Sequence, residues 1–360
     1  MKAAIFHGPH QPLTIENIDI DKPKGHEVLV RTMATGVCHS DLHFVDGLYP
    51  LPAPAVLGHE PAGIVEAVGD QVTYVKPGDH VICCLSVFCG QCEMCISGRP
   101  NLCRAPELRR GPGETPRLSW NGTPVGQFAN LGSYAEQMLL HEHAVVKVRQ
   151  DVPFGALALI GCGVTTGVGA AIKTAEVKPG STVAVFGCGG VGLNVIQGAR
   201  IAGAAKIIAV DLSAERMELA RSFGATDVVD PKGDAFKQVL EMTNGIGVDY
   251  AFEVVGMGKL VEACFKATRM GGMTVLVGVG RQDDRFSFNA MIVPFTGKTI
   301  RGCMYGSANF KVDFPMYLDL YRQKKLDLDR LVTRTYSIDD APQAFADLEK
   351  GVNARGVIVY

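Results

Sequence analysis

The stretch STVAVFGCGGVGLNVIQGARIAGAAKIIAVD, residues 181–211, decides the fold of the second half of the chain. Its first apolar run, residues 182–186, has the composition of a buried strand and ends at a glycine-rich turn. An apolar helical pattern follows, and a second strand-like run, residues 206–210, leads to Asp211. This order of elements predicts a βαβ unit in a doubly wound parallel sheet, an α/β fold.

The turn GCGGVG fits the pattern G-x-G-x-x-G. Gly187 permits a tight turn, Gly189 lets the backbone approach a pyrophosphate, and Gly192 permits close packing of helix against sheet. The helix that opens at Gly190 supplies N–H donors and the positive end of its dipole. We therefore predict a dinucleotide site, the alternative being a strand-to-helix turn without a ligand.

Asp211 ends the second strand roughly 20 residues after the last glycine of the turn. A carboxylate there accepts hydrogen bonds from the adenosine ribose and repels a 2′-phosphate, so we expect NAD rather than NADP. Arg216 is a nearby cation that can bond the ribose without reversing this preference. In the alternative interpretation, Asp211 only caps the helix that follows.

Composition narrows the class of protein. The 360 residues exceed the usual size of one hydrophobic core, so two domains are expected. Hydrophobic residues make up 47% and the net charge is −2, which argues against a nucleic-acid partner. The N-terminus MKAAIFHGPH does not resemble a secretory signal and no long apolar run suggests a membrane span, so we expect a cytosolic protein.

The pattern of the chain changes near residue 163. Short β-like runs separated by Gly and Pro turns come before it, and alternating strand and helix patterns come after it. The apolar ending GVIVY could pair back onto the first part. We expect residues 1–163 and 305–360 to form a mostly β domain and residues 164–304 to form the nucleotide-binding domain.

Four of the eleven cysteines lie close together in the sequence CGQCEMCISGRPNLC and are Cys89, Cys92, Cys95 and Cys103. Such short steps let sulfurs converge on one tetrahedral zinc, and a site with four thiolates and no open position is structural. The alternatives are an iron–sulfur cluster and four free thiols. Cys83 and Cys84, in the strand-like run HVICCLSV, are expected to be packed small residues.

Three more candidate ligands are scattered but lie beside glycines: Cys38 in GVCHSD, His59 in LGHEPAG and Cys162 in IGCGVTTG. Two cysteines and a histidine leave one coordination position of zinc open, which suits catalysis. The motifs GVCHSD, GHEPAGIVEAVG, the four-cysteine segment, GCGVTTG and GCGGVG resemble, in the same order, those of the zinc-containing alcohol dehydrogenases in the medium-chain dehydrogenase/reductase superfamily. The resemblance covers essentially the whole chain.

The resemblance implies a GroES-like β-barrel catalytic domain, completed by the C-terminal segment, and a Rossmann NAD-binding domain. It makes Cys38, His59 and Cys162 ligands of a catalytic zinc, in addition to a structural zinc in the segment of about residues 89–103. Glu60 is similar to a family carboxylate that approaches the metal during ligand exchange. Similar polyol dehydrogenases usually carry Glu in place of Cys162, which favours an alcohol dehydrogenase.

The resemblance also implies a proton path, in which Ser40 takes the hydroxyl proton of the alcohol and His43 passes it to solvent. A local turn residue and a surface histidine are the alternatives for these two positions. Leu85, Tyr49 and Met304 resemble substrate-pocket positions and suit a hydrophobic primary alcohol or aldehyde, although plain core packing is equally open.

Further cofactor contacts follow from the same resemblance. Thr166 and Val191 are similar to residues that hold the nicotinamide ring, and Arg355 is similar to a residue that contacts the pyrophosphate. His39 stands where many relatives carry an arginine on the same phosphates, so we expect a weaker fixed charge and faster release of NADH.

Two alternative functions share most of these motifs. A glutathione-dependent formaldehyde dehydrogenase needs cations at the pocket mouth, for which Arg104, Arg109 and Arg110 are candidates. An inactive zinc-stabilised NAD(H)-binding protein would have lost the catalytic metal. The long stretch of residues 104–131 resembles liver-type enzymes and favours a homodimer formed through the Rossmann domain.

Overall fold

The computed structural model describes residues 1–104, 108, 110–111 and 113–360. The chain divides into two compact units. The first consists of Met1–Cys162, Asn309–Asp319 and Leu328–Tyr360, and the second of Gly163–Ala308 and Leu320–Asp327. This division differs from the predicted one near the C-terminus, because residues 305–308 and 320–327 belong to the second unit.

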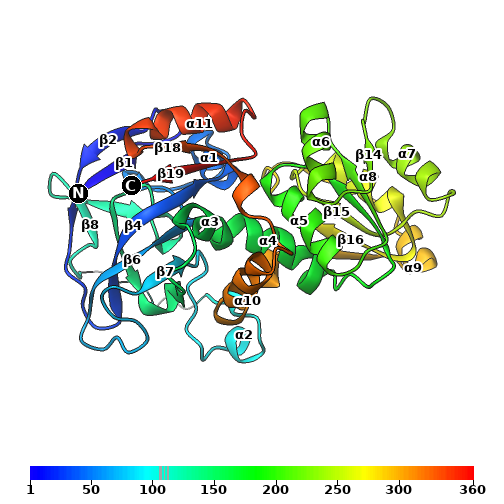
Figure 1. The fold of residues 1–360 in the computed structure, drawn as a ribbon. Helices are drawn as coiled ribbons and strands as arrows, with labels where there is room; N and C mark the ends of the chain where they lie inside the picture. The colour runs from blue at the N-terminus through cyan, green and yellow to red at the C-terminus, as the bar shows by residue number, and fades with distance from the viewer. Residues whose placement is uncertain (105–107, 109, 112) are drawn as a thin grey trace. The chain divides into compact units, whose positions relative to one another are not determined.

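Two mostly antiparallel sheets build the first unit (Figure 1). The six-stranded sheet has the order β2 (Thr14–Asn17), β1 (Lys2–Phe6), β5 (Ala55–Val56), β9 (Thr123–Gln127), β8 (Leu118–Trp120) and β3 (Asp19–Ile20). The seven-stranded sheet has the order β11 (Val145–Val148), β7 (His80–Cys83), β6 (Pro61–Val68), β4 (Glu27–Val37), β19 (Arg355–Val359) and β18 (Val332–Tyr336), and β10 (Gln137–His141) also pairs with β4.

The long strand β4 organises the seven-stranded sheet, since β6, β10 and β19 all pair with it. The C-terminal strand β19 lies antiparallel to the end of β4, with Gly356 opposite Val37 and Val359 opposite Ala34. Figure 1 shows the red strand β19 beside the blue strand β4. The apolar C-terminus therefore returns to the first unit, as its sequence predicted, and the end of β4 leads directly to Cys38.

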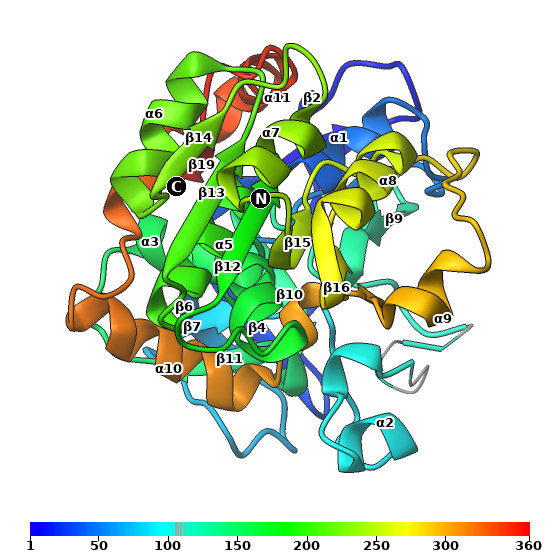
Figure 2. The ribbon, with the colours of Figure 1, turned by 90° about the vertical axis from the view of Figure 1, so that its right-hand side faces the viewer.

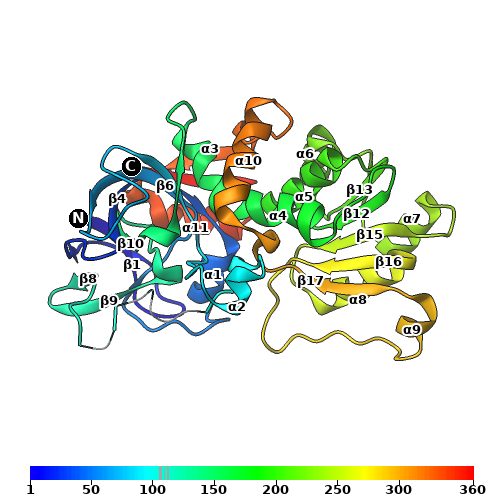
Figure 3. The same cartoon turned by 90° about the horizontal axis from the view of Figure 1, so that it is seen from below.

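Six parallel strands form the sheet of the second unit (Figures 2 and 3). Their order is β14 (Asp227–Val229), β13 (Lys206–Val210), β12 (Thr182–Phe186), β15 (Val248–Glu253), β16 (Thr268–Leu276) and β17 (Thr299–Gly302). The chain thus builds outward from β12 in one direction and then continues from β15 in the other, which is the predicted doubly wound topology. Ligands of such sheets bind beyond the carboxyl ends of the strands where the order reverses, here β12 and β15.

Helices flank these sheets. In the first unit they are α1 (His39–Val45), α2 (Glu93–Ile96), α3 (Phe154–Leu159), α11 (Ala341–Glu349) and the start of α10 (Phe310–Arg322). In the second unit they are α4 (Thr165–Gly169), α5 (Gly190–Ile201), α6 (Ala214–Phe223), α7 (Ala235–Met242), α8 (Gly258–Ala267) and α9 (Ile292–Thr296). Short 3₁₀ turns are η1 (Pro100–Leu102), η3 (Phe128–Asn130), η4 (Glu142–Ala144), η7 (Tyr305–Ser307), η8 (Asp329–Leu331) and η9 (Ile338–Asp340).

Two π-helical turns, η5 (Ile160–Val164) and η6 (Ala170–Thr174), interrupt the helical run Phe154–Thr174. This run alone, among the described residues, is long and apolar enough to cross a membrane. Because 83% of its most apolar window is buried inside the protein, it has the character of a core helix. A π turn inside a helix is often associated with a functional residue, and η5 contains Cys162.

Glu27, at the start of β4, anchors the stretch that follows the cysteine-rich segment. Arg110 donates to both Glu27 oxygens, with Nε 2.9 Å from Oε1, and Arg117 donates from Nε at 2.7 Å. Burial alone would raise the pKa of Glu27, but the bonds from Arg110 and Arg117 outweigh it and the pKa lies below its usual value. The ionised carboxylate is therefore the stable form in the fold.

We expect Arg110→Ala to lower the free energy of unfolding by about 1–3 kcal/mol at pH 7, because a buried carboxylate loses one of its two cations. The folded-state pKa of Glu27 is depressed, so this stabilisation is present above the ordinary glutamate pKa and is lost as the pH falls through the folded value. Urea unfolding from pH 7 down to about pH 3, which extends below the ordinary glutamate pKa of 4.5, measures both effects. Arg104→Ala, at an exposed position of the same stretch, is the control, and an equal loss at every pH would refute the assignment.

Candidate active site

Four side chains from three separate parts of the first unit converge at one buried point. The sulfurs of Cys38 and Cys162, a ring nitrogen of His59 and a carboxylate oxygen of Glu60 all lie within 4.8 Å of one another. Each of the four residues is buried. The structure thus brings together the three ligands and the carboxylate that the sequence predicted from scattered positions.

Local backbone geometry aims each of these ligands. Cys38 precedes α1 as its N-cap residue, with extended backbone, and Cys162 projects from the π turn η5. Gly58 turns the chain ahead of His59 with a φ of +92°, and a Cβ atom there would come within 2.9 Å of the backbone nitrogen of Tyr134. Only glycine combines this left-handed conformation with so close an approach.

A fully buried carboxylate, Asp41, orients His59. The Nδ1 atom of His59 lies 3.1 Å from Asp41, and the backbone N–H of Gly58 donates to Asp41 Oδ1 at 2.9 Å. Tyr134 donates its hydroxyl proton to Asp41 Oδ2 at 2.9 Å. Because Nδ1 is engaged by the carboxylate, Nε2 of His59 is the nitrogen left for a metal.

Glu60 and Arg355 form a buried ion pair, with Nη2 of Arg355 2.8 Å from Oε1 of Glu60. The second oxygen, Oε2, is buried without a hydrogen-bond partner among the described residues. A Cβ atom at Gly36 would overlap Oε2, so the glycine of GVCHSD makes the space in which Glu60 lies. An orphaned carboxylate oxygen beside two thiols and an imidazole fits a cation site.

Negative groups around His59 make this point of the structure attractive to positive charge. A hydrogen bond from Cys162 holds the pKa of Cys38 well below its usual value, with His59 and Arg355 adding to the effect. Burial would lower the pKa of His59, but Asp41 and Cys38 raise it. Burial also raises the pKa of Glu60 to about 7 although Arg355 opposes this. Two sulfurs, one of them readily ionised, and an oriented imidazole form a donor set suited to zinc.

The predicted proton path lies on α1, immediately after Cys38. Ser40 and His43 are three residues apart on this helix, which places them on one face, and both are half-buried. Nδ1 of His43 is buried without a hydrogen-bond partner in the described part of the chain, and its ring centroid lies 5.7 Å from that of Tyr49. His39, predicted to face phosphates, is exposed at the first position of the helix.

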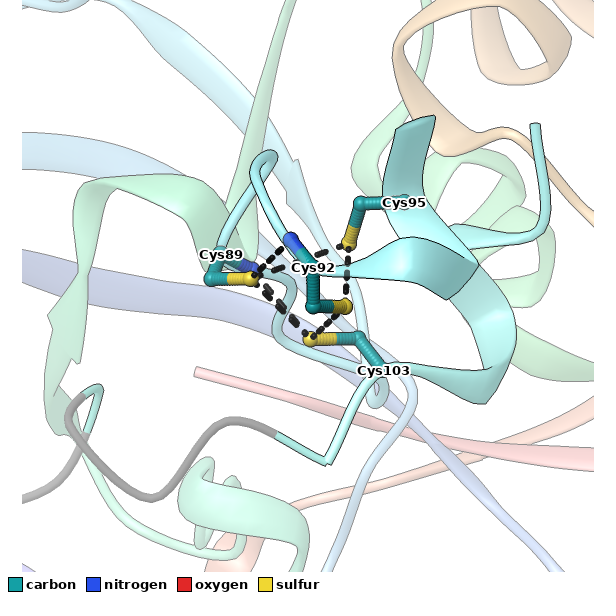
Figure 4. A group of neighbouring side chains, drawn as sticks. All are labelled: Cys89, Cys92, Cys95 and Cys103. Carbon is teal, nitrogen blue, oxygen red and sulfur yellow. Dashed lines mark hydrogen bonds between the residues drawn. The ribbon is translucent and has the colours of Figure 1, made fainter. Parts of the chain in front are cut away.

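The four cysteines of the predicted structural site converge as well (Figure 4). The Sγ atoms of Cys92 and Cys95 are 3.5 Å apart, and those of Cys103 and Cys89 are 3.7 Å apart. A tetrahedral zinc with bonds of about 2.3 Å requires sulfurs about 3.8 Å apart. The separations exclude disulfides and match one ion, whereas a cluster of several irons would hold the sulfurs farther apart.

Backbone amides prepare this site for thiolates. The N–H groups of Gln91 and Cys92 lower the pKa of Cys89 to about 7, and Cys89 N donates to the sulfur of Cys103 at 3.3 Å. By contrast, Cys83 and Cys84 are fully buried, and burial raises the pKa of Cys83. Cys83 and Cys84 are therefore packed residues, as predicted. They belong to neither of the two groups that could hold a metal.

The glycine-rich turn of the second unit has the geometry of a phosphate cradle. Gly187 has a φ of +97°, and a Cβ atom at Gly192 would overlap the carbonyl oxygen of Gly187. A Cβ atom at Gly189, in contrast, would meet nothing within 4 Å. Since α5 begins at Gly190, its first N–H groups, including that of Val191, have no partner within the helix. The turn therefore offers open space and amide donors together.

Asp211 lies directly after β13, as predicted, and the backbone holds its carboxylate. The N–H of Cys188 donates to Oδ2 at 2.8 Å and that of Ser213 donates to Oδ1 at 2.9 Å. Ser213, rather than Asp211, caps α6, because its hydroxyl accepts from the N–H of Arg216. Thr166 is half-buried on α4, and α4 packs closely on α5 because Gly167 abuts the carbonyl oxygen of Val191.

Some residues have partners that the sequence did not indicate. Arg355 contacts Glu60, and its predicted contact with a pyrophosphate stays a prediction. Of the three arginines considered for glutathione, Arg110 is engaged by Glu27 and Asp21, Arg104 is exposed, and Arg109 lies outside the described residues. Leu85 packs against the core of the seven-stranded sheet.

The sequence did not reveal three residues that surround His59 without being candidate ligands: Asp41, Tyr134 and Phe128. Asp41 and Phe128 contact His59, and Tyr134 contacts Asp41. The ring of Phe128 stands edge-on to that of His59, with centroids 5.4 Å apart. Asp41 had one available signal, its position three residues after Cys38 in GVCHSD. Tyr134 and Phe128 carry no signal of their own, because they reach the site only through the folding of the barrel.

Comparisons with known proteins match both parts of the chain. Residues 24–150 match the alcohol dehydrogenase GroES-like domain family and residues 190–323 match the zinc-binding dehydrogenase family. An alcohol dehydrogenase zinc-binding domain protein from Burkholderia ambifaria is 36% identical, with a TM-score of 0.94 over 99% of this chain and 98% of that one.

Two other solved structures are informative. Benzyl alcohol dehydrogenase from Acinetobacter calcoaceticus is also 36% identical, with a TM-score of 0.93 over 99% of this chain and 98% of that one. A putative zinc-binding dehydrogenase from Sinorhizobium meliloti 1021, bound to NADP, is 26% identical, with a TM-score of 0.84 over 100% and 99% of the two chains. With its GroES-like domain and its Rossmann-like parallel sheet, the chain belongs to the zinc-binding alcohol dehydrogenases of the medium-chain dehydrogenase/reductase superfamily.

Proposed function

We propose that this chain is an NAD-dependent alcohol dehydrogenase that interconverts hydrophobic, preferentially aromatic, primary alcohols and their aldehydes. The observation that carries the proposal is the buried convergence of Cys38, His59, Cys162 and Glu60 within 4.8 Å. An inactive scaffold has no need to retain this set together with Ser40 and His43. The proposal includes two zinc ions per chain, one in this group and one at the four cysteines.

The chain's own residues have distinct tasks in this reaction. Cys38, His59 and Cys162 hold the catalytic zinc, which when bound supplies a Lewis acid that makes the alcohol hydroxyl more acidic. Ser40 accepts the hydroxyl proton, and His43 releases it to solvent, which suits a half-buried imidazole.

The cofactor is held by the second unit. NAD supplies the hydride acceptor when bound, and the amides that open α5 bind its phosphates. Asp211, fixed by two backbone N–H groups, receives the adenosine ribose hydroxyls. A relative has been solved with NADP bound, whereas the fixed carboxylate of Asp211 at the expected ribose position supports NAD in this chain.

Aromatic side chains beside the metal group support the substrate class. Phe128 contacts His59 edge-on and packs on Phe44 at 4.6 Å between centroids, and Phe44 in turn lies 6.1 Å from Tyr49. All three aromatic residues are half-buried, so each keeps some exposed surface near the metal group. Such surfaces favour planar apolar groups, and the benzyl alcohol dehydrogenase relative is consistent with that preference.

Metal counting tests the two-zinc proposal. We expect the purified chain to hold two zinc ions, Cys38→Ala to retain one without dehydrogenase activity, and Cys92→Ala to lose the other and to unfold more easily. Cys264→Ala, a buried cysteine outside both groups, is the control and keeps two ions. Elemental analysis gives the counts, and a Cys38→Ala protein with two zinc ions and full activity would overturn the mechanism.

Cofactor choice is tested at Asp211. The variant Asp211→Asn keeps an oxygen acceptor but removes the charge that repels a 2′-phosphate. We expect the ratio of kcat/KM with NADP to kcat/KM with NAD to rise about tenfold, which corresponds to about 1.4 kcal/mol. Initial rates with both cofactors measure this ratio, and a wild-type preference for NADP, or no change in the variant, would contradict the assignment.

Substrate class is tested with a panel of aliphatic, benzylic and terpenoid alcohols, with formaldehyde plus glutathione included. We expect benzylic alcohols to have the highest kcat/KM, and Phe128→Ala to lower it about tenfold while ethanol is affected less. Phe236→Ala, a half-buried aromatic residue on α7, is the control. Strong activity only with glutathione and formaldehyde would replace the proposed function with that alternative.

A further inference from the structure

Tyr134 is a fully buried tyrosine whose hydroxyl reaches the metal group from outside. Its oxygen lies 2.9 Å from Oδ2 of Asp41 and 3.3 Å from the carbonyl oxygen of Gly36. A phenol has only one proton to donate. The shorter contact to an ionised oxygen is the stronger bond, so the proton is donated to Asp41.

Asp41 depends on this donor. Its carboxylate is fully buried and, in the described part of the chain, receives Gly58 N–H and His59 Nδ1 besides Tyr134. Gly58 donates to Oδ1, whereas Nδ1 of His59 lies 3.1 Å from each oxygen. The tyrosine is therefore the donor that fixes Oδ2, and with it the rotation of the carboxylate plane that faces His59.

The position of the hydroxyl is set by the core of the first unit. The backbone N–H of Tyr134 donates to Leu57 O at 3.0 Å, and its carbonyl oxygen accepts from Ala4 N at 2.8 Å. Its ring stands edge-on to Phe345, with centroids 5.6 Å apart. These contacts place the phenol without any contribution from a metal, so the donor is preorganised.

We propose that Tyr134 is a positioning residue of the catalytic metal site, whose hydroxyl fixes Asp41 and thereby holds His59 with Nε2 directed at the metal. This inference rests on the proposed function only in placing a metal at Cys38, His59 and Cys162. Tyr134 does not touch the reacting atoms, so it acts through Asp41. Residues that orient metal ligands in this way typically change metal affinity or activity by about 10–100-fold when removed.

The decisive variant is Tyr134→Phe, which keeps the ring and removes only the hydroxyl. With Oδ2 of Asp41 left buried without a donor, we expect the zinc held by Cys38 to pass to a chromogenic chelator about tenfold faster. We also expect kcat to fall while KM for the alcohol changes little, because the aromatic contacts are untouched. The holoenzyme is used throughout. Zinc is released from two sites, and the phase of release that is absent in Cys38→Ala is assigned to the catalytic zinc.

Tyr336 offers a matched control. Its hydroxyl donates to Asp347 Oδ2 at 2.7 Å, both residues are buried in the first unit, and neither belongs to the metal group. Tyr336→Phe therefore removes the same kind of bond and should lower thermal stability without changing the rate of zinc release. If both tyrosine variants accelerate release equally, the effect is general loosening and the proposal fails.

A second variant tests whether the effect passes through Asp41. In Asp41→Asn the release of zinc should already be fast, and adding Tyr134→Phe should change it little, because the two residues act in one chain of contacts. Additive effects, or a wild-type release rate in Tyr134→Phe, would overturn the proposal. A wild-type chain that binds zinc at Cys38 but oxidises no alcohol would overturn the proposed function alone, and one without zinc there would overturn both.

Discussion

One buried carboxylate, that of Asp41, links the parts of the first unit on which the active site depends. It receives donors from Gly58 and the ring of His59, which are neighbours in one turn, and from Tyr134, which lies in a distant stretch of the chain. An ionised group without water is costly unless its oxygens are bonded, so these stretches must meet for the fold to be stable. Because His59 is one of these donors, the bond to Asp41 also fixes the orientation of its imidazole, so folding itself sets the direction of this ligand.

The rest of the metal group shows the opposite situation, in which polar atoms remain unsatisfied. Oε2 of Glu60 and Nε of Arg355 are buried without partners among the described residues, and the sulfurs of Cys38 and Cys162 lie against each other. Buried groups of this kind are rare in stable proteins unless they serve a ligand. A divalent cation would neutralise the thiolates of Cys38 and Cys162, while the opposite charges of Glu60 and Arg355 neutralise each other. In the four-cysteine segment, by contrast, backbone N–H groups donate to the sulfurs of Cys103 and Cys89, and the four sulfurs face one another.

Much of the fold could be predicted because its signals are local. The strand, turn and helix of residues 181–211 carry their own periodicity, and the tight turn at Gly187 and the close contact at Gly192 follow from the glycine spacing. The short spacing of the four cysteines likewise implied a common ligand. The boundary near the C-terminus was less predictable, since residues 320–327 join the second unit through tertiary bonds such as that between Gln197 and Asp327.

The sequence by itself determined the doubly wound sheet, the glycine-rich turn and the four-cysteine site, because each is encoded in neighbouring residues. Its resemblance to a family also pointed to the scattered ligands Cys38, His59 and Cys162. The tertiary structure decided that Arg355 bonds Glu60, that Asp41 and Tyr134 stand behind His59, and that Phe128 lies against its ring. These contacts join residues far apart in the chain. Their existence depends on how β19 returns to β4 and how the barrel closes, and burial without water then makes each pairing obligatory.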